Sequence, residues 1–243
     1  MLIDPKSLQN NLQRLEEIEK ASLRLVVQAI YNYREEAVSI FQNERDLVAD
    51  IGEDITREAL DHMGMAKIDQ RLYGKVDYKR ARYLFHPDYA VKQALFIDSK
   101  AEKVSGQNTA TLQTSQFSML VRQIRADKAI EVAGALPNIL DIKDDSYITT
   151  TLFVKYNYDE ITPSIVNHPQ YQLKTITVAA LPNGLLQTKY NPTAQDTIWL
   201  AGRNAPSRGE AFRVRLSFPK LRQKSAWRVQ MIPVPPQDFR WAD

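Results

Sequence analysis

Apolar residues follow a helical period at the start of this chain and a strand period through much of the rest. Residues 7–45 carry apolar side chains three and four positions apart with charged residues between them, which predicts two consecutive amphipathic helices. A third helix is predicted from about Leu47 to His62, ending near Gly64. Segments rich in β-branched and aromatic residues follow, so we expect helices packed against a sheet.

Five segments are predicted to be strands: 75–85, 91–100, 148–158, 174–181 and 212–218. A turn at 86–89 is predicted between the first two. Residues 108–127 are predicted to return to helix. Neither an internal repeat nor a low-complexity stretch interrupts the chain. We therefore predict a single α/β domain over residues 1–243, with a mixed central sheet flanked by helices. Its expected parts are a mainly helical segment (1–64), a hairpin (75–100) and a basic segment (200–232).

Composition excludes several classes of chemistry. The chain has no cysteine and 3 scattered histidines, so it has no disulfide, no thiolate nucleophile and no histidine pair at zinc-binding spacing. Its apolar runs fall short of the ~18 residues of a membrane span, and the first residues lack the layout of a secretory signal. We expect a cytosolic protein without membrane association.

The net charge of +3 is unevenly distributed. Residues 1–62 hold 7 Lys/Arg and 13 Asp/Glu, whereas residues 203–243 hold 9 Lys/Arg and 3 Asp/Glu. The basic C-terminal segment is therefore where a polyanion would bind. The alternative is a solvated basic face that balances the acidic helical one.

A carboxylate and a lysine leave one predicted strand side by side. Asp98 and Lys100 follow the apolar run 94–97, and positions i and i+2 of a strand share a face. This pair suits phosphodiester hydrolysis, because a carboxylate can hold a divalent metal while a lysine orients water and offsets charge on the phosphorane.

Hydrolysis of this kind usually needs a second carboxylate. Asp88, which follows Pro87, lies ten residues from Asp98, about 33 Å along an extended strand. A hairpin centred on 87/88 instead places Asp77 opposite Asp98, within ~5.5 Å between Cα atoms. The competing interpretation is an ordinary ion pair of Asp77 with Lys79 or Lys100.

Glu53 and Asp54 are acidic residues early in the third predicted helix. Acidic residues near a helix N-terminus are favoured by the helix dipole. Alone they therefore indicate helix stabilisation, and they gain a functional meaning only beside other site residues.

Short motifs spread over nearly the whole chain resemble, in order and spacing, the SfiI/BglI group of type II restriction endonucleases. They are Leu23-Arg-Leu-Val-Val-Gln-Ala29, Glu53-Asp-Ile-Thr56, Asp77-Tyr-Lys-Arg80, Ile97-Asp-Ser-Lys100, Thr111-Leu-Gln-Thr-Ser-Gln116, Leu181-Pro-Asn-Gly-Leu185, Tyr190-Asn-Pro192, Arg208-Gly-Glu210 and Arg213-Val-Arg215.

The resemblance implies the PD-(D/E)xK nuclease fold and a Mg²⁺-dependent enzyme that cuts double-stranded DNA. It implies cleavage at interrupted palindromes with 3′ overhangs. Asp77 and Asp98 correspond to metal-binding carboxylates, Lys100 to the catalytic lysine, and Glu53 to a helix glutamate that joins the metal site. Position 76 is valine, so the proline that gives the motif its name is absent.

The resemblance also assigns DNA contacts in the basic segment. Arg213 and Arg215 fall on the strand that reads bases, and Arg208 lies in the motif just before it. Arg203 stands where relatives have lysine, and a guanidinium can grip guanine bidentately whereas an ammonium acts as a point charge. Phosphate binding by Arg213 and Arg215 is the competing interpretation.

Two other functions stay open beside the restriction endonuclease. One is a structure-specific nuclease of the junction-resolvase type, and the other is a DNA-binding module without cleavage activity. The sequence also leaves open whether the enzyme is a homodimer or a homotetramer.

Overall fold

The structure is a computed structural model that describes residues 3–44, 48–64, 82–85, 91–142, 144–161, 170–200 and 214–243. The side chains of residues 48–49 and 82–85 are outside that description. The predicted turn at 86–89 also lies outside the described residues, as do the site candidates Asp77, Arg203, Arg208 and Arg213.

Three helices form the N-terminal part, as the spacing predicts. A short 3-10 turn (η1, Pro5–Asn10) leads into α1 (Leu12–Asn32), α2 (Arg34–Asn43) and α3 (Val48–His62). The side chain of Asn11 caps α1 by accepting a hydrogen bond from the backbone of Arg14. Past the end of α3, Gly64 has a φ of 70°, a left-handed conformation that glycine adopts without strain.

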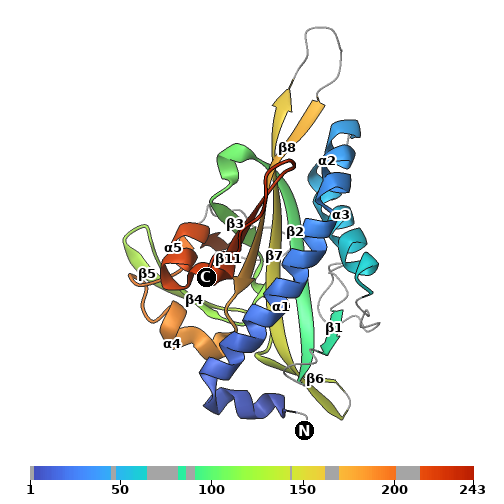
Figure 1. The fold of residues 1–243 in the computed structure, drawn as a ribbon. Helices are drawn as coiled ribbons and strands as arrows, with labels where there is room; N and C mark the ends of the chain where they lie inside the picture. Colours follow the sequence, from blue (N-terminus) through green and yellow to red (C-terminus); the bar gives the residue numbers. More distant parts are fainter. Residues whose placement is uncertain are drawn as a thin grey trace.

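A mixed sheet packs against these helices, and in Figure 1 α1 crosses in front of its strands while α2 and α3 lie at its right. Its strands follow the order β1 (Arg82–Phe85), β2 (Lys92–Lys103), β7 (Asp145–Ile161), β8 (Gln170–Leu181) and β11 (Val229–Pro233), and β6 (Ile139–Ile142) pairs with β7. Strands β2 and β7 are parallel, whereas the other pairs are antiparallel. The predicted mixed sheet flanked by helices is therefore confirmed.

Two small sheets pack beside the central one. The first contains β3 (Thr109–Leu112), β10 (Val214–Ser217) and β9 (Trp199–Leu200), and the second pairs β4 (Leu120–Arg125) with β5 (Lys128–Ala133). The predicted helix over 108–127 is wrong. Burial alternates along β3, with Ala110 and Leu112 inside and their neighbours partly exposed, which is the two-residue period of a strand.

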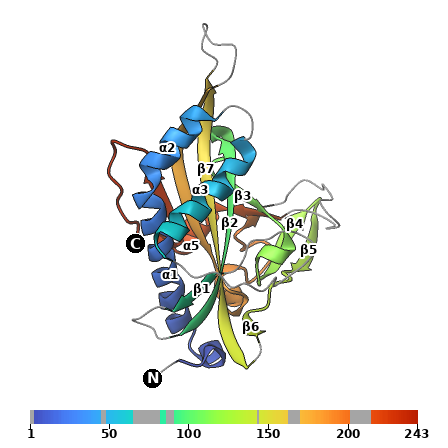
Figure 2. The same cartoon turned by 90° about the vertical axis from the view of Figure 1, so that its right-hand side faces the viewer.

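Each face of the central sheet has its own hydrophobic core. Helices α1–α3 cover one face, with Leu95, Leu152 and Val178 of the sheet beneath them. The other face, which includes Phe153 and Ala179, packs against β3, β10 and the short helix α5 (Phe218–Lys224). Figure 2 shows α2 and α3 over the sheet, with β4 and β5 projecting to one side.

A buried ion pair joins the N-terminal helix to the C-terminal segment. Arg228 donates to Glu19 on α1 at 2.6 Å, and both side chains are 0% exposed. Arg228 also approaches Glu16 at 3.3 Å. One of the basic residues counted in the C-terminal segment therefore balances the acidic helix from inside the fold and cannot bind a polyanion at the surface.

Candidate functional site

Strand β2 presents a line of charged side chains on one face. Asp98, Lys100 and Glu102 occupy alternate positions, while Ser99 and Ala101 between them face the helices. Asp98 is buried, with 4% of its surface exposed. Burial of a carboxylate is tolerated only where cations or hydrogen-bond donors face it, so this strand is the place to look for a metal-dependent site.

Helix α3 is held tightly against β2 beside this line. A Cβ atom at Gly52 would lie 3.0 Å from both the nitrogen of Ala101 and the carbonyl carbon of Lys100. Ser99 donates to the hydroxyl of Thr56 at 2.8 Å, and Thr56 and Tyr156 share a hydrogen bond of 2.9 Å. The glycine and the chain of buried hydroxyls therefore fix the helix relative to the Asp98–Lys100 segment.

Glu53 follows Gly52 and has an exposed side chain. It is the sixth residue of α3, so it lies beyond the first turn, whose acidic residue is Asp50. The helix-dipole interpretation thus fits Asp50 better than Glu53. Asp54 forms a surface ion pair with Arg57 at 2.8 Å, which differs from the helix-dipole role that the sequence suggested for it.

Lys100 links β2 to the small sheet that contains β10. Its ammonium donates to the backbone carbonyl of Thr111 on β3 at 2.6 Å. Thr111 pairs across the strands with Arg215 on β10. The guanidinium of Arg215 in turn donates to the hydroxyl of Thr109 at 3.3 Å. Lys100 and Arg215 therefore contact the same short strand, β3, at Thr111 and Thr109.

Lys155 is a site neighbour that sequence reasoning missed. It is paired in register with Lys100, is 1% exposed, and forms an ion pair with Glu102 at 2.5 Å. Burial lowers the pKa of Lys155, and the ion pair with Glu102 opposes that shift. Its sequence signal is a single charge inside a run of apolar and β-branched residues, in a strand that the sequence predicts to be central.

The pairing of β1 with β2 differs from the predicted register. Arg82 pairs with Leu95, whereas a hairpin centred on 87/88 would pair it with Gln93. The connection spans residues 86–91, because Phe85 pairs with Lys92, and it is longer than the predicted turn at 86–89. A shift of two residues preserves the alternation of positions along the strands but changes the partner directly opposite each residue.

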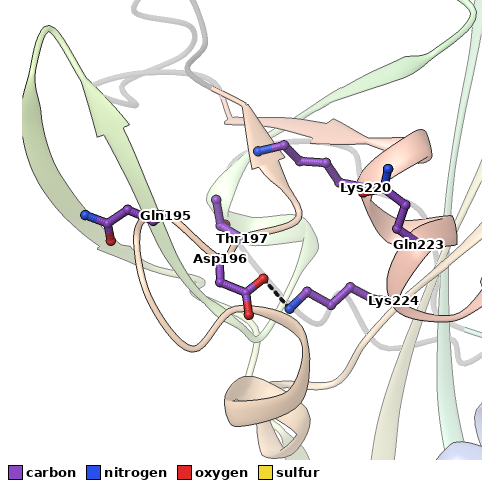
Figure 3. Close-up of a pocket in the computed structure, with 6 residues that line it drawn as sticks. All are labelled: Gln195, Asp196, Thr197, Lys220, Gln223 and Lys224. Atoms are coloured by element: carbon purple, nitrogen blue, oxygen red, sulfur yellow. Dashed lines mark ion pairs between the residues drawn. The ribbon is translucent and has the colours of Figure 1, made fainter.

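A polar pocket of about 390 Å³ lies beside β10. Figure 3 shows its walls, which are formed by Gln195, Asp196 and Thr197 before β9 and by Lys220, Gln223 and Lys224 of α5. Lys224 pairs with Asp196 at 2.5 Å across it. The pocket includes neither Asp98 nor Lys100, so it is separate from the candidate metal site.

Carboxylate oxygens are the ligands that Mg²⁺ prefers, and the buried Asp98 supplies such a group. Within the part of the chain that the structure describes, no three acidic or histidine side chains gather as a metal centre. Asp77 lies outside that part. The donor chemistry of Asp98 fits a hard divalent cation. No helix in the described ranges is long and apolar enough to cross a membrane.

Comparisons with known proteins give the class of this fold. The solved structure of tetrameric restriction endonuclease SfiI bound to cognate DNA superposes with a TM-score of 0.82 at 32% identity, covering 100% of this chain and 91% of that one. The solved structure of the restriction endonuclease BglI bound to its DNA recognition sequence superposes with a TM-score of 0.72 at 15% identity, covering 95% of this chain and 94% of that one. The fold is that of a restriction endonuclease.

Sequence comparison then gives the family. The family model described as type II restriction enzyme SfiI matches residues 34–232. Type II restriction enzyme SfiI of Streptomyces fimbriatus is 36% identical over 232 residues, which cover 90% of this chain and 84% of that protein. The chain belongs to the SfiI family of type II restriction enzymes, and it is therefore a site-specific deoxyribonuclease.

Proposed function

We propose that this enzyme hydrolyses double-stranded DNA in the presence of Mg²⁺ at an interrupted palindrome and leaves 3′ overhangs. The observation that carries the proposal is the Asp98–Lys100 pair on β2, with Lys100 bonded to the strand that pairs with Arg215. Membership of the SfiI family supports it.

The metal ligands in this proposal are Asp98, Asp77 and Glu53. Asp98 is buried on β2, and Glu53 follows the glycine at which α3 contacts the backbone of Lys100. A Mg²⁺ ion held by these residues would supply Lewis-acid chemistry, acting on the scissile phosphate and on the attacking water. These carboxylates would hold the ion by oxygen coordination.

Lys100 is the proposed catalytic lysine. Its ammonium already has one acceptor, the carbonyl of Thr111, which fixes its direction without neutralising it. An ammonium donates up to three hydrogen bonds, and in this proposal Lys100 orients the attacking water and offsets charge on the phosphorane. The proposal therefore treats the Thr111 carbonyl as the group that orients Lys100.

Arg213 and Arg215 are the proposed base-reading residues, and Arg203 and Arg208 the further DNA contacts. Arg215 and Thr111 share a face of the small sheet opposite the buried face of Val214 and Leu216. Residues two apart on a strand are separated by about 6.6 Å, so Arg213 and Arg215 can reach bases one or two steps apart. Guanine is expected in each half-site, because its O6 and N7 match a guanidinium.

We further propose that the chain acts as one domain in the cytoplasm of a prokaryotic cell and as a homodimer or homotetramer. The relative SfiI is tetrameric in its solved structure with cognate DNA. A symmetric oligomer matches a palindromic site, because each subunit presents the same reading strand to one half-site.

Plasmid digestion tests the proposed function. The protein is incubated with plasmid DNA and Mg²⁺, and the ends of the fragments are sequenced. Discrete bands with 3′ overhangs at a common interrupted sequence are expected. Smearing or cleavage confined to junctions would favour the structure-specific nuclease, and a gel shift without cleavage would favour the binding module.

A further inference from the structure

Lys155 lies where several segments meet beside the face that carries Asp98 and Lys100. Its ammonium pairs with Glu102 on β2 and donates to the carbonyls of Gly106, at 2.8 Å, and Thr109. Gly106 ends the short 3-10 turn η2 (Val104–Gly106), and Thr109 begins β3. One buried side chain of β7 therefore anchors β2, the turn after it and the start of β3.

Strand β3 connects Lys155 to both Lys100 and Arg215. The hydroxyl of Thr109 accepts from Arg215, and the carbonyl of Thr111 accepts from Lys100. β3 has only four residues, so a displacement at Thr109 is passed to Thr111 within one extended segment. The position of Lys100 thus depends on how firmly Thr109 is held.

Stability alone gives a weak reason for an ion pair at this junction. Removing the Lys155 ammonium from water costs free energy, and because Glu102 is 40% exposed, the ion pair recovers only part of that cost. Lys155 also lies near the positive charges of Lys100 and Arg215. Stability therefore gives little reason for a charged anchor here, and the strands that it joins point to a role in the site.

We propose that the Glu102–Lys155 ion pair is a positioning device that keeps Lys100 in its cleaving position while Arg215 engages DNA. This inference rests on the proposed function of Lys100 and Arg215. In this proposal the Arg215 guanidinium turns from the Thr109 hydroxyl to a base. The Lys155 ammonium then remains bonded to the Thr109 carbonyl, and β3 stays in place, so that the Thr111 carbonyl continues to orient Lys100.

The test compares two variants with a matched control. Lys155→Met removes the anchor but keeps much of its length, and Glu102→Gln removes the charge of its partner. Lys103→Met is the control, because Lys103 is the next basic residue of β2 and pairs with Glu160 of β7 at 2.6 Å, but its side chain is 61% exposed. Each protein is measured for thermal unfolding, for DNA binding in Ca²⁺ and for single-turnover cleavage in Mg²⁺.

Two DNA duplexes serve as substrates. The first contains the cognate site, found by sequencing the plasmid fragments that the unaltered enzyme cuts, and the second carries one changed base pair in that site. If the unaltered enzyme cuts no DNA, the proposed function fails before the variants are compared. We expect Lys155→Met to slow cognate cleavage by about 100-fold, as a small misplacement of a catalytic group does, while DNA binding changes less than about threefold. Lys103→Met should match the unaltered enzyme.

The changed duplex separates positioning from simple support of the fold. In the unaltered enzyme we expect one wrong base pair to reduce the cleavage rate by a larger factor than it reduces DNA binding. In Lys155→Met the two factors should be equal, because β3 is then no longer held when Arg215 engages the cognate base. Equal losses of cognate binding and cognate cleavage in this variant, or an unchanged difference between the two factors, would overturn the proposal. If Lys155→Met does not fold, Glu102→Gln is judged by the same comparison, with an expected loss of about tenfold in cleavage from partial misplacement.

Discussion

Asp98 is the residue on which the proposed chemistry most directly depends. We predict that Asp98→Ala abolishes cleavage while DNA binding in Ca²⁺ survives, because the carboxylate holds metal and reads no base. The same result is expected for Asp77→Ala. Cleavage time courses and gel shifts on one duplex give the measurement, and a variant that still cuts at a tenth of the normal rate would refute the assignment.

Two other acidic residues serve as comparisons for Asp98. Asp88→Ala is expected to leave cleavage nearly unchanged, since Asp88 lies ten residues from Asp98 along the chain, about 33 Å in an extended strand. Glu53→Gln should slow cleavage less than Asp98→Ala, because Glu53 approaches the site from a separate helix. A larger effect of Glu53→Gln than of Asp98→Ala would reverse the two roles.

Arg215 belongs to the reading strand, and its prediction concerns specificity. A bidentate contact with guanine discriminates by ~1–3 kcal/mol, so Arg215→Ala should weaken cognate binding far more than binding to a scrambled duplex. Binding is measured on both duplexes at two salt concentrations. Equal losses on both, with a salt slope lowered by about one, would indicate a phosphate contact instead.

The sequence could predict site residues only where their spacing within one element decides their geometry. Asp98 and Lys100 share a face because they are two apart on one strand. The pair Glu102 and Lys155 could not be found in this way, because it depends on the parallel register of β2 and β7. That register is set by packing between segments some fifty residues apart in the chain.

At the scale of elements, the contact of α3 with β2 depends on Gly52. A Gly→Ala change on a free helix surface stabilises by about 0.4–1 kcal/mol. At Gly52 we predict the opposite, a loss of about 1–3 kcal/mol, because the added Cβ would meet backbone atoms of Lys100 and Ala101 at 3.0 Å. Chemical denaturation provides the free energies of unfolding.

Asp54→Ala is the control for Gly52→Ala on the same helix. Asp54 and Arg57 form an exposed ion pair, and such pairs contribute 0–1 kcal/mol at the median, so a small change is expected. Cleavage should also fall in Gly52→Ala, since the helix that carries Glu53 is displaced. Unchanged stability and cleavage in Gly52→Ala would show that the helix tolerates the extra methyl group.

Elements held together locally were predicted better than those that need distant partners. Helices α1–α3 follow from a period that is complete within each segment. Residues 109–112 instead form a strand because β10, more than a hundred residues later, supplies the pairing partner. The four residues Thr109–Leu112 are too short for their periodicity to decide between helix and strand, so the tertiary partner decides.

At the scale of the molecule, ion pairs join α1, which crosses the sheet, to the C-terminal segment. Arg228 bonds Glu19 and Glu16 on α1, and Tyr190 also donates to Glu16. Burial raises the pKa of Tyr190 to about 12, so the phenol stays protonated as a donor at neutral pH. The opposite charges of the two ends of the chain, visible in the sequence, therefore meet partly inside the fold.

This contact gives a prediction for the stability of the whole chain. Arg228→Met leaves Glu19 buried without its guanidinium and should cost about 3–5 kcal/mol of unfolding free energy. Glu19→Leu should cost less, because Arg228 keeps its contact with Glu16. The double variant removes both charges and should be more stable than either single one, because no uncompensated buried charge remains. Denaturation curves of the four proteins measure the coupling, and additive losses in the double variant would show that the two side chains act independently.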